Sequence, residues 1–378
     1  MAETNDERAT DERAMDTALD LAARARRIAP PNPWVGCVVV GDDGTVLGRG
    51  STQPPGGAHA EVGALAEAGD AARGATAYVT LEPCDHHGRT PPCTGALIDA
   101  GVARVVVAVE DPDPRVAGRG IAHLRAAGIE VEVGVRAAAT TVLLAPYLHQ
   151  RRSGRAFALL KTAASLDGRT AAVDGTSQWI TGSEARADAH GLRADSEAVI
   201  VGSGTALADR PTLTARDCDP PAERQPLRVL LDARGRVPAG GPLFDPRFGS
   251  PLVFTTATAP ADRIGEWRAA GAEVEVVEPQ DGGVHLEQVL VALADHHGVV
   301  QAMVEGGAAL HGAFLDHGLA DRIVAYLAPV LLGRDARPAF DLAGPTTLAD
   351  APRWRITDTR SLGPDVRITL DPVAAEDR

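Results

Sequence analysis

Short apolar runs alternate with helical stretches through the first part of the chain. The runs VGCVVV and TVLGRG predict two strands, and the GDDG between them is typical of a hairpin turn. A buried strand is predicted at ATAYVTLEP, and further strands are predicted at ARVVVAV and IEVEVGV. An amphipathic helix is predicted near residues 14–28, and further helices separate the later strands. Strands that alternate with helices predict a mostly parallel sheet with helices on both faces.

A second alternation follows a break in the pattern near residues 145–155, where Pro, Gly and charged residues gather. Apolar runs such as AFALLKTAASLDG, EAVIVGSGTAL, PLRVLLDA and VVQAMVEGG predict another α/β unit, and WRITDTRSLGPDVRITL predicts a closing β-hairpin. We therefore expect two α/β domains, over residues 1–147 and 156–378, joined by a linker over residues 148–155.

The composition restricts the class of protein. The 378-residue chain has a net charge of −14, which disfavours nucleic acid as a partner because that partner needs a basic surface. Residues 1–12 are acidic and have no apolar core, so we expect a disordered tail and no signal peptide. The longest apolar run, residues 323–332, is too short to span a membrane. We expect a cytoplasmic protein whose four cysteines are metal ligands or core residues.

Residue counts single out two polar side chains. Lys161 is the only lysine in a chain whose other basic side chains are arginines, and Asn32 is one of two asparagines. A single lysine in a chain that otherwise uses arginine suggests a chemical role that a guanidinium cannot fill. The alternative is that this lysine was retained by chance. Asn32 lies in a proline-rich turn, where asparagine is also common for purely conformational reasons.

The stretch LEPCDHHGRTPPC carries the candidate metal chemistry. Cys84 and Cys93 enclose His86 and His87, which resembles a compact Cys2His2 site. A closed site of that kind needs separated pairs such as Cys-x2-Cys, and this spacing lacks them.

A histidine from farther upstream is the alternative ligand. His59 begins a predicted helix, Cys84 follows a strand, and Cys93 precedes the next helix. These positions lie at one edge of the predicted sheet, where helix N-termini favour thiolates.

The order H-A-E, P-C and a later Cys resembles the signature of zinc nucleoside and nucleobase deaminases. With NPWVGCVVV, GGAHAEVGAL and the long insert CDHHGRTPPC, the first half resembles the deaminase half of the bifunctional riboflavin-biosynthesis enzymes. The resemblance implies a cytidine-deaminase-like three-layer domain with one zinc ion. It assigns the zinc ligands to His59, Cys84 and Cys93, and the proton shuttle to Glu61. It also implies substrate contacts at Asn32 and His86, while Asp85 departs from the serine usual in the pattern.

The second half resembles the reductase half of the same enzymes, through LKTAASLDGRT, SQWITG, LRADSEAVIVGSGTALADRPTLTAR and VEGGAALHGAFL. This resemblance implies a dihydrofolate-reductase-like fold that binds NADPH. The implied cofactor contacts are Ala163, Trp179, Thr205, Asp209, Gly307, Ala308, Ala309, Leu310, His311, Gly312 and Ala313. The implied substrate contacts are Ser177, Arg193, Leu213, Arg216 and Glu305. Arg193 and Arg216 suit a phosphate group, and Lys161 is our hypothetical catalytic residue.

We therefore expect a homo-oligomeric enzyme that deaminates and then reduces a small phosphorylated pyrimidine of the riboflavin pathway. Two other classes remain open from the sequence. One is a deaminase of nucleic acid or free nucleosides with an accessory domain, which the acidic balance and SQWITG disfavour. The other is a non-catalytic zinc protein that binds nucleotides, which the presence of Glu61 and all three candidate ligands disfavours.

Overall fold

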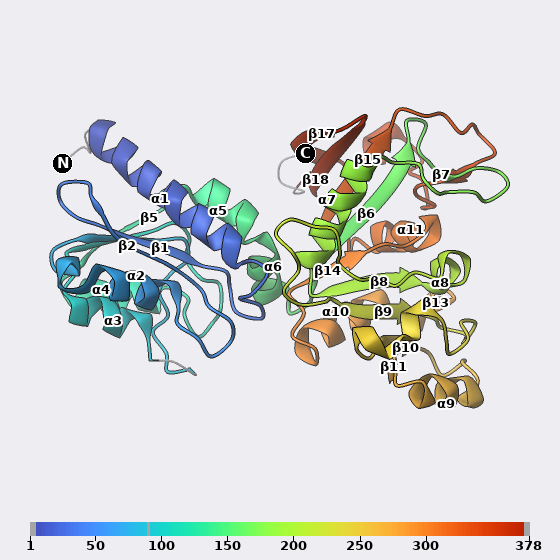
Figure 1. Ribbon diagram of the computed structural model, residues 1–378, viewed down its shortest axis with the longest axis horizontal. Coiled ribbons are helices and arrows are strands. Elements are labelled where there is room, and N and C mark those ends of the chain that lie inside the picture. Colours follow the sequence, from blue (N-terminus) through green and yellow to red (C-terminus); the bar gives the residue numbers. More distant parts are fainter. Residues whose placement is uncertain (1–4, 89–90, 374–378) are drawn as a thin grey trace. The chain divides into compact units, whose positions relative to one another are not determined.

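The computed structural model describes residues 5–88 and 91–373, with the side chains of residues 5–7 left aside. The chain divides into two compact units, Met1–Gly154 and Arg155–Arg378 (Figure 1). Each unit is built around its own sheet. In the described ranges no helix is long and apolar enough to cross a membrane.

The sheet of the first unit has the strand order β2-β1-β3-β4-β5. Its strands are β1 (Gly36–Val40), β2 (Val46–Ser51), β3 (Thr76–Val79), β4 (Arg104–Val107) and β5 (Glu130–Val133). The hairpin predicted at GDDG is confirmed, because β1 and β2 pair antiparallel. β1 is antiparallel to β3 as well, and parallel pairing begins at β3. The prediction of a mostly parallel sheet is therefore wrong at this edge. The strands β2 and β3, which α2 connects, run in the same direction, but β1 lies between them and is antiparallel to both.

Helices cover both faces of this sheet. They are α1 (Asn5–Ala25), α2 (Ala60–Ala68), α3 (Cys93–Ala100), α4 (Arg119–Ala126), α5 (Ala137–Leu143) and α6 (Ala145–Ser153). Strand glycines admit the closest helices: a Cβ on Gly36 would meet the Ala18 carbonyl of α1 at 1.9 Å, and one on Gly50 would meet the Ala60 carbonyl of α2 at 2.0 Å. Gly50 is paired with Cys37, the neighbour of Gly36, so the two glycines face opposite sides of the sheet.

The N-terminal segment differs from the prediction of a disordered tail over residues 1–12. Residues 5–12 belong to α1, while residues 1–4 lie outside the described part. The reason is Asp11, whose buried carboxylate accepts hydrogen bonds from the hydroxyl of Tyr78 at 2.6 Å and from Arg104 at 2.7 Å. A buried ion pair of this kind holds the acidic turn against the sheet.

The segment predicted as a linker, residues 148–155, is largely helical. It overlaps α6, which has Pro146 in its first turn and is followed by Gly154 in a left-handed conformation. Tyr147 and Leu148 are buried, and the Tyr147 hydroxyl donates to Asp111 at 3.0 Å. Apolar residues of this segment therefore pack as part of a helix.

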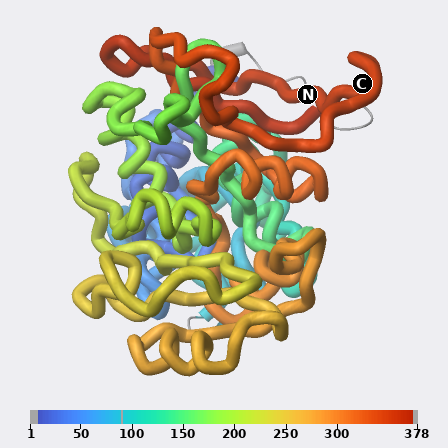
Figure 2. The backbone as a smooth tube through the Cα atoms, turned by 90° about the vertical axis from the view of Figure 1, so that its right-hand side faces the viewer, coloured from blue at the N-terminus to red at the C-terminus, as the bar shows by residue number. Residues whose placement is uncertain are grey.

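The sheet of the second unit has the order β11-β10-β9-β8-β14-β6-β15-β18-β17. Its strands are β6 (Phe157–Ser165), β8 (Ala198–Gly202), β9 (Leu227–Leu231), β10 (Leu252–Thr255), β11 (Glu273–Val276), β14 (Gln301–Val304), β15 (Arg322–Ala328), β17 (Trp354–Leu362) and β18 (Asp365–Pro372). Pairing is parallel from β11 to β15. The predicted closing hairpin is confirmed as β17–β18 at one edge, opposite the yellow segments of the other edge (Figure 2).

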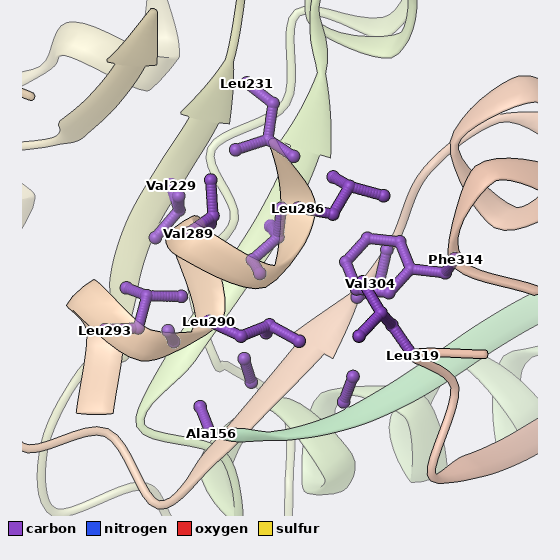
Figure 3. Close-up of a cluster of buried hydrophobic side chains, with 14 of the residues drawn as sticks. Ala156, Val229, Leu231, Leu286, Val289, Leu290, Leu293, Val304, Phe314 and Leu319 are labelled. Atoms are coloured by element: carbon purple, nitrogen blue, oxygen red, sulfur yellow. The ribbon is translucent and has the colours of Figure 1, made fainter. Parts of the chain in front are cut away.

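Helices pack on this sheet to form its core. They are α7 (Ser183–Ala194), α8 (Ser203–Asp209), α9 (Ala261–Ala269), α10 (Leu286–Asp295) and α11 (Ala308–Asp316). Leu290 and Leu293 of α10 lie with Val229 of β9 and Phe314 of α11 in one buried cluster (Figure 3). The core fixes β6, β8 and β14 side by side, so the residues at their carboxyl ends open into one region, as expected for ligand sites of parallel sheets.

Candidate active sites

Three metal-binding side chains converge in the first unit. His59 caps the start of α2, Cys84 lies in the loop after β3, and Cys93 is the first residue of α3. The Nδ1 atom of His59 lies 3.2 Å from the Sγ of Cys93 and 3.6 Å from the Sγ of Cys84. All three donor atoms lie within 4.8 Å of one another, so the cluster that combines an upstream histidine with both cysteines is confirmed.

The thiols of this cluster favour metal binding. The contact with Cys93 lowers the pKa of Cys84 to about 4, and the same contact raises the pKa of Cys93. One thiolate therefore forms readily beside His59, and the second thiol loses its proton when a cation replaces it. Two sulfur atoms and one imidazole nitrogen suit zinc, and three protein ligands are the number typical of a catalytic zinc site.

Glu61 lies beside the cluster without belonging to it. It follows His59 by two residues on α2 and is 4% exposed. Burial and the neighbouring Cys84 raise the pKa of Glu61 to about 7. A carboxyl group that changes protonation near neutral pH can accept and return a proton.

The other residues of this unit that the sequence singled out are His86, His87 and Asn32. His86 is half-buried, and its buried Nδ1 has no hydrogen-bond partner in the described part of the chain, whereas His87 is exposed. Neither histidine belongs to the donor cluster. Asn32 is half-buried in the turn before β1.

A cleft of about 1810 Å³ opens at the carboxyl ends of the parallel strands in the second unit. Most of the predicted reductase contacts line it. They are Lys161, Ala163, Ser177, Trp179, Arg193, Thr205, Asp209, Leu213, Arg216, Glu305, Gly307, Ala308, Ala309, Leu310 and Ala313. Gly307 caps α11 without a side-chain acceptor, so the first N–H groups of that helix suit a phosphate group.

Lys161, Arg193 and Glu305 form a charged group inside this cleft. Arg193 holds the Glu305 carboxylate through Nε and Nη2, the latter at 2.8 Å, and donates from Nη1 to the Thr214 carbonyl at 3.0 Å. Lys161 Nζ lies 3.8 Å from the same carboxylate. Burial would raise the pKa of Glu305, but the two cations outweigh burial and lower it to about 2. Arg193 therefore orients Glu305, and the phosphate contact expected of Arg193 stays a prediction.

Comparison with known families accounts for both units. Residues 8–109 match the cytidine and deoxycytidylate deaminase zinc-binding region, and residues 156–368 match the RibD C-terminal domain. The chain is 45% identical to the riboflavin biosynthesis protein RibD of Chlamydia muridarum over 365 residues, covering 96% of this chain and 97% of that protein. It is 44% identical to RibD of Escherichia coli over 371 residues, covering 95% and 99%.

The chain belongs to the RibD family. Solved RibD structures have the same fold throughout. Acinetobacter baumannii RibD is 41% identical with a TM-score of 0.87, and the match covers 97% of this chain and 100% of that one. The diaminohydroxyphosphoribosylaminopyrimidine deaminase/5-amino-6-(5-phosphoribosylamino)uracil reductase of Thermotoga maritima is 31% identical with a TM-score of 0.84, at the same coverage.

Two residues that the RibD resemblance assigned to the cofactor do not line the cleft. His311 is 1% exposed, and its Nε2 lies 3.3 Å from the Val304 carbonyl. A Cβ on Gly312 would meet the Asp341 carbonyl at 1.7 Å, so this glycine serves close packing. Both positions lie on the face of α11 that points into the core, because a run of consecutive helical residues includes one such face, and their assignment to the cofactor stays a prediction.

The sequence patterns did not single out Glu82. Glu82, buried two residues before Cys84, accepts hydrogen bonds from the backbone N–H groups of Asp111, Gly118 and Ile121. These contacts attach the segment before α4 to the strand that leads to the cysteine loop. The available signal was a carboxylate inside an apolar strand, since such a group is buried only with partners.

Proposed function

We propose that this chain catalyses the deaminase and reductase steps of riboflavin biosynthesis on a phosphorylated pyrimidine. The first step removes an amino group of 2,5-diamino-6-(5-phosphoribosylamino)pyrimidin-4-one by hydrolysis, and the second reduces the ribosyl chain with NADPH. The observation that carries this proposal is the His59–Cys84–Cys93 cluster with buried Glu61, present in the same chain as the Lys161–Glu305 cleft.

Glu61 carries the proton transfers of the deamination. Zinc held by His59, Cys84 and Cys93 supplies a Lewis acid that makes water acidic enough to ionise near neutral pH. The Glu61 carboxylate would take one proton from the attacking water and pass it to the ring nitrogen while the water oxygen bonds to the amino-bearing carbon. It would then carry the proton of the resulting hydroxyl to the amino group, whose bond to carbon breaks so that ammonia leaves. The unpartnered Nδ1 of His86 and the amide of Asn32 bind the substrate at this site.

Lys161 acts in the reduction. NADPH supplies the hydride when bound in the cleft, with Ala163, Trp179, Thr205, Asp209 and the start of α11 as its contacts. Lys161 Nζ, oriented by Glu305, donates a hydrogen bond to the ribosyl oxygen on which a proton is needed as the ring opens. Ser177, Leu213 and Arg216 complete the substrate site, and the Arg216 guanidinium binds the phosphate group.

A coupled assay tests both steps in one experiment. The purified chain is given the pathway pyrimidine and NADPH, and ammonia release and cofactor absorbance are followed together. We expect ammonia first and cofactor oxidation after it. Faster ammonia release from cytidine, deoxycytidylate or tRNA would instead favour a deaminase of nucleosides or nucleic acid.

We also propose that the enzyme is a cytoplasmic homo-oligomer. Support comes from Leu166 and Leu331 of the second unit, which are 66% and 70% exposed, on segments joined by a hydrogen bond from the Leu166 N–H to the Val330 carbonyl. Thiols that must stay reduced to bind metal suit the cytoplasm. Light scattering on Leu331→Glu tests the association, since the variant should have a lower mass than the parent.

A further inference from the structure

Asp85, the residue that departs from the serine usual at its position, makes two hydrogen bonds next to the metal-binding cysteines. Its Oδ1 atom accepts from the hydroxyl of Thr94 at 2.6 Å and contacts the Nδ1 of His123 at 2.5 Å. Asp85 directly follows Cys84, and Thr94 directly follows Cys93. The carboxylate therefore joins the two residues that follow the two cysteine ligands.

Backbone contacts link the same two segments. The N–H of Thr94 donates to the Cys84 carbonyl at 3.3 Å, and the N–H of Cys93 points to the Sγ of Cys84 at 3.5 Å. Cys93 and Thr94, on the α3 side of this junction, are both fully buried. The Asp85 side chain is 24% exposed and belongs to the loop that carries Cys84. Its hydrogen bond with Thr94 therefore connects this loop to α3.

His123 extends this connection to a third element. It lies on α4, and it is 48% exposed at its side chain. One carboxylate oxygen has two lone pairs and can accept from both Thr94 and His123. The Asp85 side chain thus contacts both α3 and α4.

We propose that Asp85 is a positioning residue for the zinc ligands, which acts through Thr94 to hold the two cysteine sulfur atoms at the separation that a metal ion requires. This inference rests on the zinc site of the proposed function and goes beyond it. Without the Asp85–Thr94 bond the loop end gains freedom, and metal binding has to order it again. Partners of metal ligands change metal affinity by about tenfold to a hundredfold when they are removed.

The test measures the zinc dissociation constant of the full chain by competition with a chromogenic chelator at neutral pH. We expect Asp85→Ala and Thr94→Val each to weaken zinc binding by about tenfold or more, and Thr94→Ser, which keeps the hydroxyl, to stay within about threefold of the parent. The double variant Asp85→Ala/Thr94→Val should bind zinc as tightly as Asp85→Ala alone, because Asp85→Ala already removes the bond to Thr94. Asp99→Ala, which removes an exposed carboxylate of α3, is the matched control and should leave zinc binding unchanged.

The outcomes separate this proposal from the proposed function. A parent chain that binds no zinc would refute the metal site itself. A parent that binds one zinc ion while Asp85→Ala and Thr94→Val bind it as tightly would refute only the positioning role. Equal losses from Thr94→Ser and Thr94→Val would also refute it. The unfolding temperature of the metal-free variants should match the parent, and a drop that accounts for the lost affinity would reduce Asp85 to a purely structural residue.

Discussion

Each site contains a glutamate, Glu61 in the first unit and Glu305 in the second, and different neighbours determine the pKa of each carboxyl group. Glu61 is governed by burial beside a thiolate, whereas Glu305 is governed by two cations. Consequently one carboxyl group is suited to carry a proton near neutral pH, and the other stays ionised and orients Lys161. Two buried glutamates thus serve two kinds of chemistry.

Replacing Glu61 by Gln should abolish the proton transfers and leave the metal in place. The amide has nearly the same size but cannot shuttle a proton, so we expect deamination to fall by about 10²–10⁴-fold. Zinc content by elemental analysis should stay near one ion per chain, because Glu61 is not in the donor cluster. Reduction of the deaminated intermediate is the internal control and should be normal. Loss of both activities would contradict separate sites.

Replacing Lys161 by Arg should slow the reduction. The pair of Lys161 and Glu305 leaves room for a compact ammonium beside Arg193, and a planar guanidinium cannot take the same position. We expect the turnover of reduction to fall by about tenfold to a hundredfold, with NADPH binding measured by fluorescence nearly unchanged. Normal turnover in this variant would end the hypothesis that Lys161 is catalytic.

His190 should make the second unit sensitive to mild acid. Burial, followed by the positive charges of Arg193 and Arg216, lowers the pKa of His190 to about 4 from 6.5. Between those values the unfolded chain binds a proton that the folded chain does not, so the free energy of unfolding decreases as the pH falls from 6.5 to 4. Above pH 6.5 the effect vanishes. Calorimetry on His190→Gln should show a shallower pH dependence in this window, and an unchanged slope would contradict the assignment.

At the scale of elements, local sequence patterns predicted the two hairpins correctly. They failed at the start of α1, where contacts with residues far away in the sequence determine the structure. The β1–β2 and β17–β18 hairpins need only their own turn residues. The start of α1 depends on Asp11 meeting Tyr78 and Arg104, which are far away in sequence. No pattern within residues 1–12 reveals those partners.

The close packing of α2 against the sheet should depend on residue 50 being a glycine, which has no Cβ. Its Cβ would meet the Ala60 carbonyl at 2.0 Å, one residue after His59. Gly50→Ala must move the helix start, so we expect a loss of about 1–3 kcal/mol in stability together with weaker zinc binding.

Gly95→Ala is the matched control for Gly50→Ala. It lies within α3, where the nearest atom to a new Cβ is the Pro92 Cγ at 3.9 Å, and it should keep or slightly raise stability. Chemical denaturation and zinc titration of both variants measure the difference. Equal stability and zinc affinity in the two variants would contradict the role given to Gly50.

At the scale of the whole molecule, the two chemistries use separate sets of residues. The zinc donors all belong to Met1–Gly154, and every residue that lines the cleft belongs to Arg155–Arg378. The metal-binding cluster and the position of Glu61 beside it could be predicted because these residue types follow a recognisable order along the chain. Inward-facing residues such as His311 could not be separated from cleft-lining neighbours, since that distinction depends on which face of α11 meets the core.

Removing zinc should therefore disable one activity and spare the other. We expect a strong chelator, or Cys84→Ser with Cys93→Ser, to stop ammonia release completely while NADPH still binds and the deaminated intermediate is still reduced. Restoring zinc to the chelated parent should restore deamination, whereas the double variant should not respond. A parallel loss of NADPH binding would mean that the second unit depends on the metal.

The acidic start of α1 has a practical consequence for shortening or tagging this protein. A truncation that trims residues 1–12 as a flexible leader would delete Asp11 and leave the Tyr78 hydroxyl and the Arg104 guanidinium without the carboxylate they share. Burying the Tyr78 hydroxyl without this acceptor is costly, and Arg104 loses one of its carboxylate partners, so we expect the shortened protein to be less stable for reasons unrelated to its catalytic residues. Affinity tags are better placed ahead of residue 5, where the first helix begins.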